Sequence, residues 1–216
     1  MLHPSALVPL AVLCGALVAL PAHAGRPLVV DDADVAEAGT GHVEAWYGRL
    51  TGRTNTWNVA PVYVVVDGLE LGAALVRDTT APTTGSALQA KWRIAPVQEH
   101  GCNLGASVGA SHASHGGGNA TFVNAIGTCN SDFGALHLNL GGNRASHGPT
   151  LGTWGVAVER AFDRITANLE VFGQRRSKPG FQAGLRTDIA PGLQLDGSIG
   201  RQERDTLFSV GFKKIY

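Results

Sequence analysis

Charged side chains that alternate with apolar ones are the residues best placed to do chemistry in this sequence. Between positions 86 and 95, Lys91 and Arg93 alternate with Trp92 and Ile94. Successive side chains of an extended strand point to opposite faces, so the two charges would share one face. On the inner face of a barrel, such charges can line a bore and select among ions, or they can pair with one another and close it. The sequence leaves both readings open for these candidate lining residues: Glu44, Glu70, Lys91, Arg93, His137, Glu159, Glu170, Arg186 and Asp196.

A second group that could do chemistry is a set of histidines in glycine-rich stretches. The tetrapeptide Ala-Ser-His-Gly occurs at 113–116 and again at 145–148. Imidazoles can bind zinc or copper, and a base beside a serine can activate it as a nucleophile. No cysteine or carboxylate accompanies them at a suitable spacing, so we expect solvated loops, with no catalytic residue, metal or cofactor. The residues concerned are His112, His115, His147, Ser111, Ser114 and Ser146.

The beginning of the chain has the pattern of an export signal. Residues 7–20 are an apolar run, and Ala22 and Ala24 place small residues where a signal peptidase cleaves. We therefore expect residues 1–24 to be a cleaved signal peptide, followed by a polar periplasmic leader at 25–41. The leader has an acidic cluster that could touch a cation but is expected to be solvated: Asp31, Asp32 and Asp34.

From His42 onward, short alternating segments separated by turn residues predict an antiparallel sheet. Most have the length of a tilted strand that crosses a membrane, and a sheet can cross a membrane only as a closed barrel. The fold class expected for 42–216 is an all-β antiparallel transmembrane barrel of about 12 strands, with roughly 10–14 possible. The expected strands are 42–49, 55–66, 69–77, 86–95, 102–111, 119–129, 134–142, 151–161, 164–174, 180–189, 192–202 and 205–216.

The connections between these segments predict the orientation of the barrel. If both ends of the chain are periplasmic, the connections after odd-numbered strands are the outer loops and should be the longer ones. The stretches 78–85, 112–118 and 143–150 fit this expectation, and the Asp-Gly turn at 67–68 is a short inner one.

Aromatic residues indicate the partners of such a barrel. The last strand ends in alternating apolar residues that resemble the signal read by the outer-membrane assembly machinery: Phe208, Val210, Phe212 and Tyr216. Other aromatics fit a belt at the membrane–water interface, in contact with lipid: Trp46, Tyr47, Trp57, Tyr63, Trp92 and Trp154. Basic and acidic residues balance at 17 each, so nothing in the charge points to a nucleic acid.

Two cysteines remain in the mature chain. Cys102 opens one expected strand and Cys129 closes the next, which places them opposite each other across a hairpin. Cysteines in an oxidising compartment form disulfides when their Cβ atoms are close. We therefore expect a Cys102–Cys129 disulfide near the periplasmic rim, the alternative being two free thiols.

The start of the mature chain resembles a known group of outer-membrane proteins. Residues 25–34, Gly-Arg-Pro-Leu-Val-Val-Asp-Asp-Ala-Asp, are followed by Gly39 and the strand start Val-Glu-Ala-Trp at 43–46. This opening is similar to that of proteins proposed as transporters and linked to the meta-pathway of phenol degradation. The resemblance implies a barrel in the bacterial outer membrane that passes small molecules, with aromatic ones as one class; it implies no catalytic residue.

The sequence thus predicts a narrow channel for passive passage of small solutes across the outer membrane. Small residues on the expected inner face favour some open bore: Gly72, Gly105, Ser107, Gly109, Gly141, Gly155, Gly184 and Gly200. The alternatives are a structural or adhesive barrel with a sealed lumen, and a lipid-modifying enzyme that would depend on Ser114 and His115.

Overall fold

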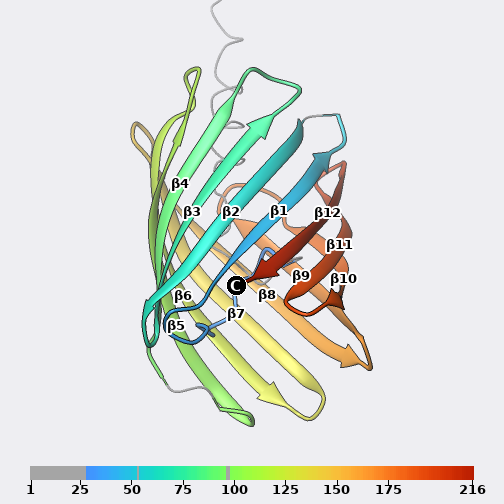
Figure 1. The fold of residues 1–216 in the computed structure, drawn as a ribbon. Coiled ribbons are helices and arrows are strands. Elements are labelled where there is room, and N and C mark those ends of the chain that lie inside the picture. The colour runs from blue at the N-terminus through green and yellow to red at the C-terminus, as the bar shows by residue number, and fades with distance from the viewer. Residues whose placement is uncertain (1–27, 53, 96–97) are drawn as a thin grey trace, which may run out of the picture.

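The chain folds into one closed antiparallel β-barrel, in which every strand pairs with its neighbours in the sequence and β12 pairs with β1 (Figure 1). The computed structural model describes residues 28–52, 54–95 and 98–216, and the expected signal peptide at 1–24 lies outside them. Within those ranges, no helix is long and apolar enough to cross a membrane. The strands are β1 (Gly41–Leu50), β2 (Thr54–Val66), β3 (Leu69–Asp78), β4 (Thr84–Arg93), β5 (Gly101–Ala113), β6 (Gly118–Ser131), β7 (Gly134–Ala145), β8 (Thr150–Phe162), β9 (Ile165–Gln174), β10 (Gly180–Ala190), β11 (Leu193–Gln202) and β12 (Asp205–Ile215).

The barrel confirms the fold class and the strand number expected from the sequence, but it shortens the loops. β5 and β6 stay paired as far as Ala113 and Gly118, so their connection is only 114–117. Continued pairing satisfies backbone groups that a loop would expose, and this extends the strands into the expected outer loops. The expected contrast between longer outer and shorter inner connections is confirmed for most of them: the outer ones include 79–83, 114–117, 146–149 and 175–179, and the inner ones include 67–68, 132–133, 163–164 and 191–192. The exceptions are 94–100, a long inner connection, and 203–204, a short outer one.

The two faces of the sheet have opposite polarity. On β10, Phe181 and Leu185 are each 55% exposed, whereas Gln182 between them is buried. Apolar exterior and polar interior are the arrangement of a barrel that spans a membrane, the inverse of a soluble sandwich. Trp57, Tyr63, Trp92 and Trp154 also lie on the exterior.

Trp46 is the exception among the aromatics expected in the belt. It is two residues from the buried Glu44 on β1, and side chains two apart share a face. Trp46 therefore points into the barrel, whereas Tyr47 points outward, where its ring centroid is 5.3 Å from that of Trp57.

A charge on the exterior should destabilise the barrel. Leu185 is near the middle of β10, so Leu185→Arg would place a guanidinium at mid-membrane depth and lower the free energy of unfolding by about 2–4 kcal/mol. Urea unfolding in lipid vesicles measures the change, and Leu185→Ala is the control that removes the side chain without adding charge. Equal stability of the Arg and Ala variants would contradict a lipid-facing exterior.

The two mature cysteines are bonded to each other. Cys102 on β5 and Cys129 on β6 are directly paired in the register and joined by a disulfide, next to the pair Gly101 and Asn130 at the open end of the hairpin. The bond closes a loop with a sequence separation of 27 residues.

Removing the disulfide should weaken the barrel without unfolding it. Cys102→Ser with Cys129→Ser should lower the free energy of unfolding by about 3 kcal/mol, because the unfolded chain regains the freedom of the open loop. Urea unfolding checks this, and reductant added to the wild type should give the same loss. An unchanged midpoint in both would contradict the expectation.

Candidate functional site

The polar residues expected to line a bore are all on the interior face of the barrel. Glu44, Glu70, Lys91, Glu170 and others are buried, on the face opposite the exposed apolar side chains. The remaining members are less completely covered: Arg93, Glu159 and Arg186 keep 16%, 11% and 27% of their side-chain surface. The predicted lining residues thus all face the interior of the barrel. That they line a path for solutes remains a prediction.

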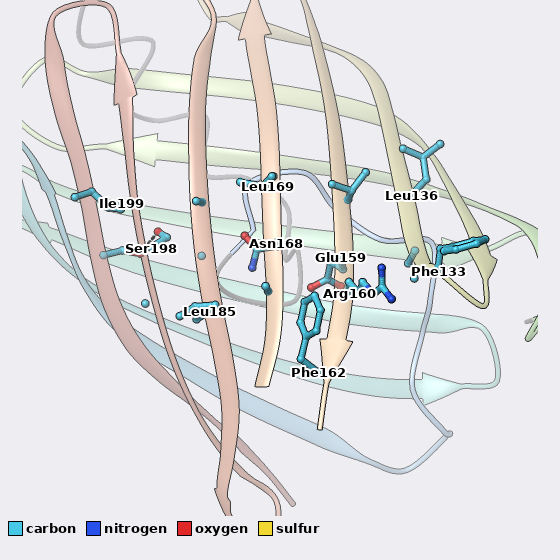
Figure 2. A pocket seen from close by; sticks show the side chains of 18 of the residues that line it. Phe133, Leu136, Glu159, Arg160, Phe162, Asn168, Leu169, Leu185, Ser198 and Ile199 are labelled. Carbon is cyan, nitrogen blue, oxygen red and sulfur yellow. Dashed lines mark hydrogen bonds between the residues drawn. The ribbon is translucent and has the colours of Figure 1, made fainter. Parts of the chain in front are cut away.

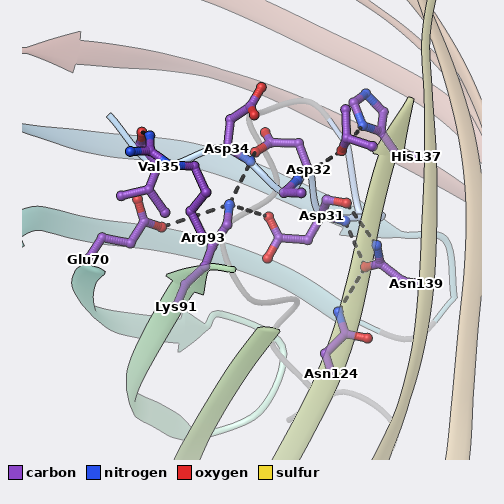
Figure 3. A network of polar contacts seen from close by, with 12 residues as sticks. Asp31, Asp32, Asp34, Val35, Glu70, Lys91, Arg93, Asn124, His137 and Asn139 are labelled. Carbon is purple, nitrogen blue, oxygen red and sulfur yellow. Dashed lines mark hydrogen bonds and ion pairs between the residues drawn. The ribbon is translucent and has the colours of Figure 1, made fainter. Parts of the chain in front are cut away.

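The leader occupies this interior. Leu28, Val30, Asp31, Ala33 and Val35 are all buried, and Asp31 is only 1% exposed. Figure 3 shows the acidic cluster among side chains from several strands of the barrel wall. The expectation of a solvated acidic leader is therefore wrong, because the wall supplies partners that replace water.

The wall holds the leader mainly through the leader backbone. Both carboxylate oxygens of Glu170 on β9 accept from the Val29 amide at 2.9 Å, and one also accepts from the Val30 amide at 2.8 Å. The side-chain amide of Asn139 on β7 accepts from the Asp31 amide at 2.9 Å and donates to the Asp31 carbonyl at 2.8 Å.

The contacts continue across the wall toward β4. The Thr128 hydroxyl on β6 accepts from the Ala33 amide at 2.8 Å. The Arg93 guanidinium on β4 donates to the Val35 carbonyl at 3.0 Å. Successive leader residues thus meet β9, β7, β6 and β4 in turn, so the segment crosses the strands rather than extending one of them.

Lys91 is the charged centre of the docked leader. Its ammonium, 2% exposed, is 3.0 Å from Asp31, 3.1 Å from Asp32 and 3.9 Å from Glu70 of the wall. Burial raises the pKa of Asp31 well above its usual range, although Lys91 acts against this. Burial would also raise the pKa of Asp32, but Lys91 together with His137 and Lys213 outweighs burial and lowers that pKa to about 2. Asp32 therefore stays ionised and forms a lasting ion pair with Lys91.

A chain of hydrogen bonds and ion pairs connects the leader, through β6, β7 and β8, to β10. The Thr128 hydroxyl accepts from the Ala33 amide and lies 2.9 Å from Nδ1 of His137. The hydroxyl can therefore donate its own proton to that ring nitrogen. Nε2 of His137 is 3.3 Å from Glu159, which is 3.0 Å from the Arg186 guanidinium. Three predicted lining residues are thus joined as an ion-pair network. Thr128 and Asn139 were not predicted, because uncharged polar residues occur on every strand and neither carries a distinguishing motif.

An apolar seat receives the first leader residues. Leu28 and Val30 pack against Ala157 on β8, with Phe172 of β9 beside them. Gly155, also on β8, lies so close that a Cβ there would be 2.6 Å from Cγ2 of Val30. The absence of a side chain at Gly155 makes room for the leader.

Filling this seat should weaken the docking of the leader. Gly155→Ala forces a methyl group against Val30, and such overpacking costs about 1–3 kcal/mol. We expect the leader to be cleaved several times faster by a protease specific for aspartate. Gly152→Ala on the same strand is the matched control, because its Cβ would meet only a carbonyl at 4.0 Å. Identical cleavage of both variants would show that the seat does not hold the leader.

The other candidate residues do not assemble a catalytic or metal site. His115 Nδ1 is 2.9 Å from the Ser114 hydroxyl, but His115 is exposed and Ser114 half-buried in the turn 114–117, and Ser114 also accepts from the Thr84 amide. His112 is bonded to Asn119 at 2.7 Å. In the part of the chain that the structure describes, no three His, Cys, Asp or Glu residues are grouped to hold a metal ion.

A groove of about 1130 Å³ lies on the exterior of β7 to β12 (Figure 2). Its walls are mostly outward apolar side chains such as Leu136, Leu169, Leu185 and Ile199, all exposed. The groove faces the lipid and is separated from the leader by the barrel wall, so it is not part of the interior site.

Comparison with protein families gives one match, which spans residues 12–207 and carries the description "Uncharacterised conserved protein UCP029691". The chain belongs to this family. The match includes the leader and nearly all of the barrel, so the two are parts of one family unit. No curated protein matches the sequence.

Solved structures show how this family folds. A porin, KdgM, is similar with a TM-score of 0.68 at 11% identity, covering 80% of this chain and 98% of that one. An outer-membrane channel of Pseudomonas putida F1 gives a TM-score of 0.58 at 11% identity, over 86% and 98%. The outer-membrane protein Omp33 of Acinetobacter baumannii gives 0.56 at 10% identity, over 82% and 97%. The family therefore has the fold of outer-membrane barrels, and together with the apolar exterior this places the protein in a bacterial outer membrane.

Proposed function

We propose that this protein is an outer-membrane channel for passive passage of small solutes, closed by its own leader in the state described. The observation that carries the proposal is a polar, charged barrel interior whose occupant is a segment of the same chain and is not one of its strands. A wall that binds a detachable segment through hydrogen bonds can also exchange it for water and solutes.

The composition of the interior supports a bore once the leader has left. Buried charged residues of both signs face inward. Gly155 lies close against Val30 of the leader, and Gly105 lies against both Trp92 of β4 and Ala33 of the leader. Release of the leader would thus vacate space in the middle of the barrel. One of the similar structures is a porin described in complex with oligogalacturonate, which shows that a barrel of this fold can admit a chain-like solute.

The resemblance of residues 25–34 to transporters linked to phenol degradation selects the first solutes to test. Small aromatic acids are one class, and short oligosaccharides are the comparison class suggested by the porin. The C-terminal strand, with Phe208, Val210, Phe212 and Tyr216 exposed, is proposed as the segment that the assembly machinery and the lipid contact.

The experiment that tests the proposal is conductance of the purified protein in a planar bilayer. We expect discrete ohmic steps that are rare in the wild type and frequent in variants that release the leader. Ion substitution and then solute competition would follow. A correctly folded, heat-modifiable barrel that stays silent even when its leader is demonstrably released would overturn the channel.

A sealed structural or adhesive barrel is the second candidate, and the docked leader favours it. The ion pairs of Lys91 and the network of His137, Glu159 and Arg186 close the interior in the same way that a packed core would. The two candidates differ in the released state, because only the channel then conducts. A lipid-modifying enzyme is disfavoured, since the Ser114–His115 pair lies in an exposed turn and His115 Nδ1 bonds to Ser114 rather than to an orienting carboxylate.

A further inference from the structure

We propose that the barrel interior is a binding site for acidic peptides, and that the leader is the peptide bound there in cis. This inference deepens the proposed function, because it names a ligand class for the same interior. It is nevertheless tested by binding, which does not require that the barrel conducts.

The first argument is that the wall recognises peptide backbone. Four wall residues make hydrogen bonds to the leader backbone. Glu170 accepts from the amides of Val29 and Val30, and Thr128 accepts from the amide of Ala33. Arg93 donates to the carbonyl of Val35. Asn139 bonds both the amide and the carbonyl of Asp31, two groups that every residue except proline presents. Backbone groups are common to all peptides, so the wall is not restricted to the leader.

The second argument is that side-chain contacts define a sequence pattern. The seat at Gly155, Ala157 and Phe172 takes an apolar residue at the position of Val30. Lys91 takes acidic residues at the next two positions, where Asp31 and Asp32 lie. The preferred ligand is therefore a peptide segment with an apolar residue followed by two acidic ones.

The third argument is the state of Glu170 when the leader is absent. Its carboxylate is 3% exposed, and its partners are the Val29 and Val30 amides and the side chain of Gln182. Among the described residues, none forms an ion pair with Glu170. When the leader leaves, this carboxylate faces the bore, where a second peptide can offer it successive N–H groups in place of water.

The test uses a fluorescent peptide with the sequence of residues 28–37, titrated into the full-length protein in detergent micelles and followed by anisotropy. The protein carries Asp31→Asn and Asp32→Asn, which weaken its own leader at Lys91 and leave the wall intact. We expect the peptide to bind this variant at least tenfold more tightly than the wild type, whose leader competes for the same wall.

The control peptide is methylated on the backbone nitrogens that correspond to Val30 and Ala33. These N–H groups donate to Glu170 and Thr128, and methylation removes them without changing any side chain. We expect at least tenfold weaker binding. In the protein, Glu170→Gln should weaken the unmodified peptide by about tenfold, since hydrogen bonds to charged groups are the stronger ones. Lys214→Met on β12, whose exposed ammonium donates to the Pro191 carbonyl, should have no effect.

The outcomes separate this inference from the channel. Equal binding of the methylated and unmodified peptides, or no binding to the Asp31→Asn, Asp32→Asn variant, would overturn the peptide site. If the peptide does not bind the Asp31→Asn, Asp32→Asn variant but the barrel shows clear conductance steps, the peptide site is overturned and the proposed channel is retained. Selective peptide binding to a barrel that never conducts would support the site and overturn the channel.

Discussion

Replacing Lys91 with methionine is expected to release the leader and raise the open probability of the barrel by about two to three powers of ten. Lys91 is 2% exposed and lies 3.0 and 3.1 Å from Asp31 and Asp32. Removing one partner of a buried ion pair costs about 3–5 kcal/mol, because the other charge is left buried and unpaired. In the released state the two aspartates return to water, so the cost of leaving them unpaired destabilises only the docked state. Each 1.4 kcal/mol or so changes the equilibrium between docked and released leader tenfold.

Two measurements check the Lys91 result independently. Single-channel recording gives the open probability, and cleavage by an aspartate-specific protease reports whether the leader is exposed. Lys214→Met on β12 is the matched control, since the exposed Lys214 ammonium donates to the Pro191 carbonyl at 3.2 Å and this partner is not a leader residue. A protected leader in Lys91→Met would show that the backbone contacts alone hold it.

A disulfide between the leader and the wall is expected to lock the barrel closed. A Cβ built on Gly155 lies 3.5 Å from Cβ of Val30, which is within the range that a disulfide spans. Val30→Cys with Gly155→Cys should therefore crosslink when oxidised and abolish openings. Reduction should restore them to at least the frequency of the wild type, because neither cysteine then ties the leader to β8.

The single variant Val30→Cys is the control for the lock, since it cannot crosslink and adds no bulk. The wild type must also be recorded with and without reductant, because the Cys102–Cys129 disulfide is reduced under the same conditions. Openings that persist in the oxidised double variant, after mass spectrometry has confirmed the crosslink, would show that the conducting path does not depend on the leader.

Both predictions concern one equilibrium, in which the leader is either docked or released. The affinity of the wall for the leader has two contributions. Hydrogen bonds from the leader backbone to Glu170, Asn139 and Thr128 are one, and the ion pair of Lys91 with the acidic side chains is the other. A ligand that carries its own acidic groups and peptide N–H groups can satisfy both parts. Competition of this kind would couple the arrival of a ligand to the departure of the leader.

The sequence by itself determined the barrel and the faces of its strands. Alternation with a period of two is a local property, so Lys91 and Arg93 could be assigned to the interior, and Trp92 to the exterior, from their neighbours alone. The Cys102–Cys129 pair followed from hairpin symmetry in the same way. Trp46 was placed wrongly because its residue type was weighed more than its register with Glu44.

Only the tertiary structure decided what occupies the interior. The amides of Val29 and Val30 meet a carboxylate 141 and 140 positions away, at Glu170, and no periodic pattern links residues so distant in the sequence. The leader contacts β9, β7, β6 and β4, whose inward side chains surround one interior only when the sheet has curved into a barrel. Asp31 and Asp32 look like a solvated cluster in the sequence, since the ammonium that neutralises them belongs to Lys91 on the opposite wall.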